Sequence, residues 1–256
     1  MHHDPPSLFI LLVVLPAAAL MLYLLALRHE SNWPRHRIIA FATGITLLML
    51  AGTPRIADWA HHDLRGHMIQ HLLLGMFAPL GLVLGAPGTL LLRRLPVRAA
   101  RRVAAFFGTI PLRILTHPLT AALLDIGGMF VLYLTPLFAI SMQDPVLHIL
   151  LHVHFVLAGY LFTWSIAGPD PAPHRPGLKM RMLVLFLATA AHGILSKIMY
   201  GYGFPHGTHA PLAQVEAAAL WMYYGGDLAE ALLAAMLLVI WLRRRGDIAT
   251  MRPVAA

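Results

Sequence analysis

Seven long apolar runs divide this chain and decide what it can fold into. A helix needs about 20 apolar residues to cross the hydrocarbon core of a bilayer. The runs cover residues 7–27, 37–54, 67–92, 114–138, 147–167, 182–204 and 214–242. A mean hydropathy of +0.71, with 59% hydrophobic residues, exceeds what a soluble domain can bury. We therefore expect an all-α, polytopic membrane protein in which residues 1–256 form one domain with seven transmembrane helices.

Lysine and arginine lie almost entirely in alternate connections between these runs. Segments 28–37, 93–113, 175–181 and 243–252 hold 3, 6, 3 and 4 of them, which is 16 of the 19. The other connections hold only Arg55 and Arg65, and Lys197 falls inside the sixth run. Because basic loops stay on the cytoplasmic side, we expect the N-terminus outside and the C-terminus inside.

The same charge distribution predicts the partners of the chain. The net charge of +8 is shared among four segments, as topology requires, and no nucleic-acid recognition module is present. We expect membrane lipid as a partner and no nucleic acid. Residues 93–113 form a basic cytoplasmic segment, which we expect to lie as an interfacial helix on anionic lipid.

The 16 histidines are biased toward the opposite side. Eleven fall at the predicted outer face or in the outer halves of the spans: His2, His3, His61, His62, His67, His71, His148, His152, His154, His206 and His209. Four fall on the cytoplasmic side: His29, His36, His117 and His174. His192 lies deep in the sixth run. Lipid solubility does not explain this bias, since either interface accommodates histidine equally well.

Two histidine pairs have the spacing of metal ligands. His67 and His71 are four residues apart, as are His148 and His152, so each pair shares one helix face with about 6 Å between its members along the axis. Two such helices facing each other can surround one metal ion. Imidazole suits zinc, copper, iron and nickel, and thioether sulfur favours Cu(I). Secondary donor candidates on the same side are His61, His62, His154, Met68 and Met222. The chain has no cysteine, so thiolate ligands are excluded.

Ionisable residues also lie inside the predicted spans, where they are costly and usually functional. They are Asp125, His192, Lys197, Asp227 and Glu230. We expect His192, Asp125 and Asp227 to form one polar cluster, reached from the outer mouth through the inner members of the two histidine pairs. His192 is then an inner metal ligand or proton carrier, and Lys197 neutralises a carboxylate. A structural ion pair is the alternative interpretation.

Four parts of the sequence form a recognisable set of motifs: "HMIQHLLL" at His67 followed by "APLGLVLGAP", "HPLTAALLDIG" at His117, "LHILLHVHFVLAGYLFTWSIAGPDP" at Leu147, and "WMYYGGD" at Trp221. Together they resemble the CtaG family of membrane proteins, which assist the assembly of cytochrome c oxidase. The resemblance covers residues 35–242. It does not extend to the single-span copper chaperones that share the name, because those carry cysteine.

The resemblance implies a seven-span fold in the bacterial cytoplasmic (inner) membrane and a role in supplying copper to the oxidase. Within the matching motifs, His67, His71, His148 and His152 take the ligand positions. The last span departs from the family pattern, since Gln214-Val215 and Met222-Tyr223 replace the Asp-Gln and Met-Trp pairs of relatives. The implied partners are oxidase subunits, and homo-oligomerisation is left open.

We therefore expect a copper-binding metallochaperone that is not an enzyme. No Ser-His-Asp or phosphate-loop pattern is present. A haem-binding membrane cytochrome is one alternative, in which His71 and His152 on facing helices ligate one haem. A copper- or proton-coupled transporter that uses the deep polar groups is the other, although no internal repeat is evident.

Overall fold

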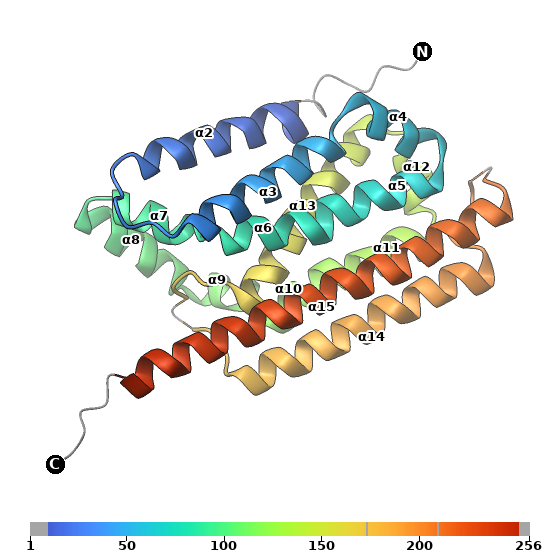
Figure 1. Ribbon diagram of the computed structural model, residues 1–256. Coiled ribbons are helices and arrows are strands. Elements are labelled where there is room, and N and C mark those ends of the chain that lie inside the picture. Colours follow the sequence, from blue (N-terminus) through green and yellow to red (C-terminus); the bar gives the residue numbers. More distant parts are fainter. Residues whose placement is uncertain (1–9, 173, 209, 251–256) are drawn as a thin grey trace.

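The computed structural model describes residues 10–172, 174–208 and 210–250, and every regular element in these ranges is helical (Figure 1). His2, His3, His209 and the first three residues of the predicted first span lie outside the described residues. The expected all-helical fold class is confirmed.

The helices follow the seven apolar runs. The first half of the chain contains η1 (Ile10–Val14), α2 (Leu15–Leu27), α3 (Arg35–Ala51), α4 (Pro54–His62), α5 (Leu64–His71), η2 (Leu72–Phe77), α6 (Ala78–Leu84), α7 (Pro87–Arg94), α8 (Val97–Phe107) and α9 (Ile110–Leu115). The second half contains α10 (Pro118–Ala122), η3 (Leu123–Gly127), α11 (Gly128–Leu134), α12 (Leu137–Ser141), α13 (Pro145–Ala167), α14 (Leu178–Tyr202) and α15 (Leu212–Thr250). The elements named η are π-helical turns.

Five helices in the described part of the chain are long and apolar enough to cross a membrane. They are Ile10–Leu27, Leu64–Leu84, Pro145–Ala167, Leu178–Tyr202 and Leu212–Arg243. A sixth candidate joins α3 to α4 through a bend of 54°. The remaining predicted run forms the apolar helix Pro118–Leu134, which is too short to count with the others. The third predicted run, 67–92, is also divided, because the backbone at Ala86 turns left-handed (φ 51°) before α7 begins.

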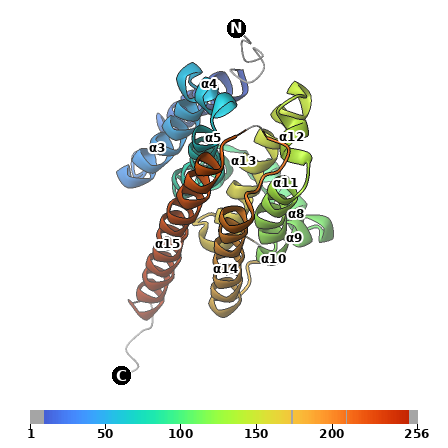
Figure 2. The ribbon, with the colours of Figure 1, turned by 90° about the vertical axis from the view of Figure 1, so that its right-hand side faces the viewer.

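The two ends of the bundle differ in chemistry. Figures 1 and 2 show the α2–α3 connection, α7 to α9, the start of α14 and the end of α15 at one end, which we name the basic end. There Glu30 forms ion pairs with Arg93, at 3.2 Å, and with Arg94. The opposite end, the histidine end, holds α4, α12 and the first turns of α5 and α13. The segments that the sequence predicts on one side of a membrane thus lie at one end of the bundle.

Small residues let the central helices approach closely, as they do in membrane proteins generally. A Cβ atom on Gly81 would lie 2.5 Å from the Ala40 carbonyl oxygen, where α6 crosses α3. A Cβ atom on Gly159 would lie only 2.0 Å from the carbonyl oxygen of Gly75, where α13 crosses η2. Along the chain, the second crossing comes one turn after the histidine pair that precedes η2 and two turns after the pair on α13. The close approach there determines how far apart the two histidine pairs lie.

The α13–η2 crossing yields a test with a built-in control. Gly159→Ala should destabilise the protein by about 1–3 kcal/mol, because the added methyl meets backbone that has no room to move. Gly75→Ala should be nearly neutral, since the nearest atom to its Cβ is 3.7 Å away. Thermal unfolding of both variants in one detergent measures the difference, and equal stability would contradict the close crossing.

Candidate metal-binding site

Both helices that carry a histidine pair begin in the same way. The sequences are "DLRGHMIQH" from Asp63 and "DPVLHILLH" from Asp144, each with the pattern D-x3-H-x3-H. Asp63 caps α5 by accepting from the Arg65 amide at 2.8 Å, and Asp144 caps α13 by accepting from the Val146 amide at 2.9 Å. Each cap fixes the helix start one turn before the first histidine of its pair. Sequence reasoning missed this repeat, which the spacing alone reveals.

The cap of α5 is strengthened by charge. The Arg65 guanidinium donates to both carboxylate oxygens of Asp63, at 2.6 to 3.1 Å. Hydrogen bonding from the Arg65 side chain is the main cause that lowers the pKa of Asp63 from 3.8 to about 2. A depressed carboxyl pKa stabilises the fold above about pH 4, and this contribution is lost only as pH falls toward 2. The start of α5 therefore keeps its cap throughout the physiological range.

The two pairs meet at one small cavity of about 30 Å³. Its polar lining consists of His67, Gln70, His71, Ser141, His148 and His152. We name it the histidine cavity. A volume of this size matches one water molecule or one bare ion. The structure thus brings together the four histidines of the two predicted pairs, whereas His192, the fifth predicted ligand, does not line this cavity.

His67 and His71 present ring nitrogens that no described residue satisfies. The unpartnered atoms are Nδ1 of His67 and Nε2 of His71, and both are buried. Aromatic rings hold the two imidazoles in place: Phe138 lies 4.8 Å from the His67 ring and Phe155 lies 5.5 Å from the His71 ring, centroid to centroid. Burying a polar atom without a partner is costly, so these nitrogens are available for a ligand that the protein itself does not supply.

His152 is engaged differently. Its Nδ1 lies 2.9 Å from the His148 carbonyl oxygen, and its Nε2 lies 3.2 Å from Oε1 of Gln70. The Gln70 amide nitrogen donates to the Ala51 carbonyl at 2.9 Å, which fixes the direction of that amide. Both ring nitrogens of His152 therefore face oxygen atoms of the protein. Gln70 was not predicted, because an amide in an apolar run carries no spacing signal.

The geometry as it stands does not form a complete coordination sphere. No group of three or more histidine, aspartate or glutamate side chains in the described residues is arranged to hold one metal ion. The His148 and His152 rings are stacked obliquely with centroids 4.4 Å apart. The wall of the histidine cavity contains one pair of imidazoles from each of two helices.

The secondary histidine candidates lie around this cavity and not in its wall. His61 is exposed on α4, and its ring centroid lies 6.0 Å from that of His148. His62 is also exposed, and its Nδ1 contacts the Asp58 carbonyl oxygen at 2.8 Å. His154 points to the other side of α13, where its Nε2 contacts the carbonyl oxygen of Leu124 in η3 at 3.0 Å.

The predicted sulfur donors are core residues. Met68 and Met222 are 1% and 0% exposed and belong to one apolar cluster with Phe155 and Leu195. Neither lines the histidine cavity. Both methionines therefore serve in core packing. The donors that the histidine cavity presents are nitrogen and oxygen atoms.

A second polar group lies deeper in the bundle. His192, on α14, is fully buried, and its Nδ1 lies 3.7 Å from a carboxylate oxygen of Glu230 on α15. The ring packs against Gly226, where a Cβ atom would lie 1.9 Å from His192 Cε1. The structure corrects the predicted choice of carboxylate, because Glu230 and not Asp227 makes the contact with His192.

Other predicted members of this deep group are placed as follows. Asp125, 3% exposed, interacts electrostatically with Glu230, and so does the half-buried Asp227. The prediction that Lys197 neutralises a carboxylate is wrong: its side chain is exposed and its Nζ lies 5.3 Å from the Tyr223 ring centroid. We name His192, Glu230 and Asp125 the deep cluster.

Two π-helical turns lie beside the histidine cavity and the deep cluster, since η2 starts directly after His71 and η3 contains Asp125. Such turns are often found at functional sites, and neither could be predicted from the sequence.

Comparison with known proteins identifies the family. A family model described as cytochrome c oxidase caa3 assembly factor (Caa3_CtaG) matches residues 19–244. The chain belongs to this family. The resemblance inferred from the sequence motifs is confirmed, over nearly the whole of the described structure.

Relatives of this Caa3_CtaG chain occur in mycobacteria. It is 35% identical over 175 residues to the uncharacterized protein Mb0105 of Mycobacterium bovis, and the match covers 65% of this chain and 26% of the relative. The uncharacterized protein ML1998 of Mycobacterium leprae is 31% identical over 172 residues, 64% of this chain and 26% of the relative. The chain thus spans about a quarter of the length of these relatives. No solved structure matches it.

Proposed function

We propose that this chain assists cytochrome c oxidase assembly by binding a copper ion in the histidine cavity and passing it to an oxidase subunit. One observation carries the proposal: four imidazoles on two equally capped helices line a cavity of ion size in a member of an oxidase-assembly family. The role is that of a carrier, so copper is cargo and the protein catalyses no reaction.

The donor set supports copper as the ion. His67 Nδ1 and His71 Nε2 are the unpartnered donors, and imidazole is a good copper ligand. Cu(I) accepts few ligands, so a pair of imidazoles is enough to hold it while it is transferred. His152 is held by Gln70 and the His148 carbonyl, and it serves to orient the cavity wall. The volume of about 30 Å³ leaves no room for a haem ring, which argues against the cytochrome alternative.

We place the histidine end outside and the basic end in the cytoplasm, with seven spans in the bacterial cytoplasmic membrane. The concentration of arginine and lysine at one end of the bundle supports this orientation, and the α3–α4 pair and Pro118–Leu134 complete the seven. The histidine cavity then opens on the side where the copper sites of the oxidase receive metal.

Delivery needs a surface beside the cavity. A larger pocket of about 420 Å³ lies at the histidine end and is lined by His61, His62, Asp63, Met142 and Gln214, among others. Because His61 also borders His148, this pocket leads from the surface toward the histidine cavity. We propose it as the place where an oxidase subunit receives copper.

The ligand assignment predicts a contrast between two histidines that differ in their contacts. His71→Ala should reduce copper bound by the purified protein at least tenfold and abolish its support of oxidase maturation. His154→Ala is the matched control, since that ring binds a backbone carbonyl away from the cavity. Elemental analysis of both variants measures copper, and equal copper content in the two would contradict the site.

The orientation can be tested by single-cysteine labelling, because the chain has no cysteine of its own. A membrane-impermeant maleimide should label Thr208→Cys in intact cells and spare Gly177→Cys until the cells are opened. Thr208 lies at the histidine end, and Gly177 precedes α14 at the basic end. The reverse labelling pattern would invert the topology and move the cavity to the cytoplasmic side.

A transporter is the second candidate, and the buried polar atoms of His192, Glu230 and Asp125 that lack hydrogen-bond partners favour it. Under this proposal His192 and Glu230 form an inner station for the ion or for a proton. Glu230→Gln should abolish the support of oxidase maturation while copper still binds in the histidine cavity. Asp227→Asn, a charge removal on the same helix, should leave function near wild type.

Comparing the Glu230→Gln and Asp227→Asn variants also distinguishes a functional role of the deep cluster from a structural one. If Glu230→Gln lowers only the amount of protein, and oxidase maturation per molecule is unchanged, the deep cluster is a structural pair. If Asp227→Asn impairs oxidase maturation and Glu230→Gln does not, then Asp227 and not Glu230 is the functional carboxylate. Immunoblotting of membranes together with an oxidase activity assay provides both measurements.

A further inference from the structure

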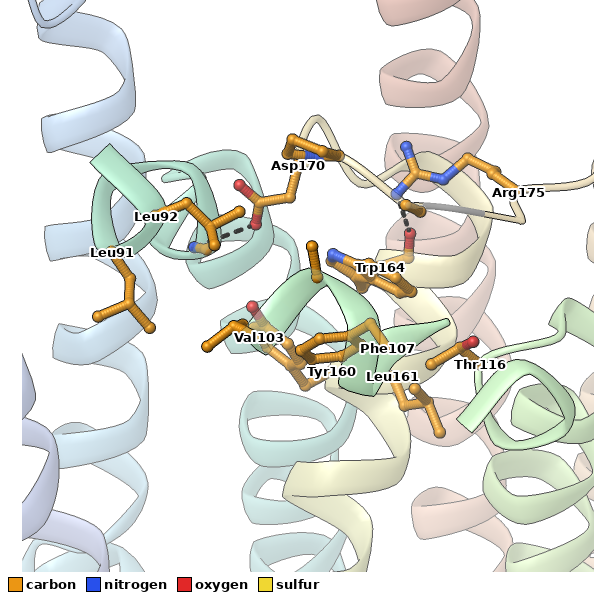
Figure 3. A pocket seen from close by; sticks show the side chains of 14 residues that line it. Leu91, Leu92, Val103, Phe107, Thr116, Tyr160, Leu161, Trp164, Asp170 and Arg175 are labelled. Atoms are coloured by element: carbon orange, nitrogen blue, oxygen red, sulfur yellow. Dashed lines mark hydrogen bonds between the residues drawn. The ribbon is translucent and has the colours of Figure 1, made fainter. Parts of the chain in front are cut away.

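A large cavity lies at the basic end, at the opposite end of the bundle from the histidine cavity. It has a volume of about 590 Å³ and forms where α7, α8, the last turns of α13 and the segment that follows α13 meet (Figure 3). Apolar side chains that line it include Leu91, Val103, Phe107, Leu161 and Trp164. Leu91 and Phe107 are 54% and 40% exposed, so the cavity is reached from the surface.

Two charged residues mark one side of this cavity. Figure 3 shows Asp170 and Arg175 on that side, and Val103, Phe107 and Leu161 on the other. The Asp170 carboxylate accepts from the Thr89 amide at 2.7 Å, from the Thr89 hydroxyl at 2.5 Å and from the Gly88 amide at 3.3 Å, so it is satisfied by α7. Arg175 donates to the carbonyl oxygens of Gly168 and Trp164, and its guanidinium lies 5.1 Å from the Trp164 ring centroid.

The helix that forms the opposite wall is amphipathic. Val103, Ala104 and Phe107 of α8 line the cavity. By helical spacing its arginines occupy the other face, and all three are exposed: Arg98, Arg101 and Arg102. No residue of α8 is buried in the protein. A helix with this division of residues lies at a membrane interface, with its basic face near lipid headgroups.

We propose that this cavity is a binding site for one anionic glycerophospholipid. An acyl chain lies in the apolar part, under α8 and against Leu161, and the phosphate lies on the side of Arg175. Charge complementarity selects an anionic headgroup, since guanidinium is well suited to phosphate. The apolar lining selects a lipid over a soluble phosphate. The proposal is independent of copper binding.

The test uses phospholipids with brominated acyl chains, which quench nearby tryptophan. A variant of the full chain, in which the other four tryptophans are replaced and only Trp164 remains, is used. It is placed in nanodiscs of phosphatidylcholine that contain a small mole fraction of one brominated lipid. Brominated phosphatidylglycerol should quench Trp164 with about fivefold higher apparent affinity than brominated phosphatidylcholine, the preference that one basic residue near the headgroups provides.

Two matched variants on α8 locate the site. Ala104→Phe fills the cavity and should abolish the preferential quenching, whereas Ala105→Phe adds the same side chain on the face away from the cavity and should preserve it. Equal quenching by both lipids, or loss of preference in both variants, would overturn the proposal. Thermal unfolding of the two variants controls for folding, and a folded Ala104→Phe protein that keeps the preference would also overturn it.

Discussion

The crossing of α13 over η2 at Gly159 and Gly75 is the contact on which the candidate site depends. A Cβ on Gly159 would sit 2.0 Å from the Gly75 carbonyl oxygen, so only glycine permits this approach. The two helices carry their histidine pairs above this point, and their separation there sets the width of the histidine cavity. A slightly wider crossing would leave four separate interfacial histidines. The backbone contact is therefore what turns two sequence motifs into one site.

Within the cavity, hydrogen bonding divides the imidazoles into two kinds. His152 is fixed through both nitrogens, one by Gln70 and the other by the His148 carbonyl. His67 and His71 are fixed by aromatic packing instead, which leaves a nitrogen on each without a partner. A carrier needs both properties, since a rigid wall preorganises the site and unpartnered donors allow an ion to bind and to leave.

The sequence predicted those features that depend on periodicity. Apolar runs, basic segments at one end and histidines spaced four apart are local patterns, and the structure reproduces them in α5 and α13. Tertiary features were not predictable in the same way. Asp227 and Glu230 are three residues apart on one helix, and only the packing of α14 decides that Glu230 faces His192. Gln70 and the π-helical turns carry no signal in a single sequence. A single sequence also does not distinguish a core methionine from a ligand at Met68, because core packing and sulfur ligation share one residue type.

The central claim is that copper binds through imidazole nitrogen in the histidine cavity, and X-ray absorption spectroscopy of the copper-loaded protein tests it most directly. The account predicts a first shell of nitrogen with the multiple-scattering signature of at least two imidazoles, and loss of that signature in the His67→Ala, His71→Ala double variant. A first shell dominated by sulfur, or an unchanged spectrum in the double variant, would contradict the account, because it would place the metal on methionine or on histidines outside the cavity.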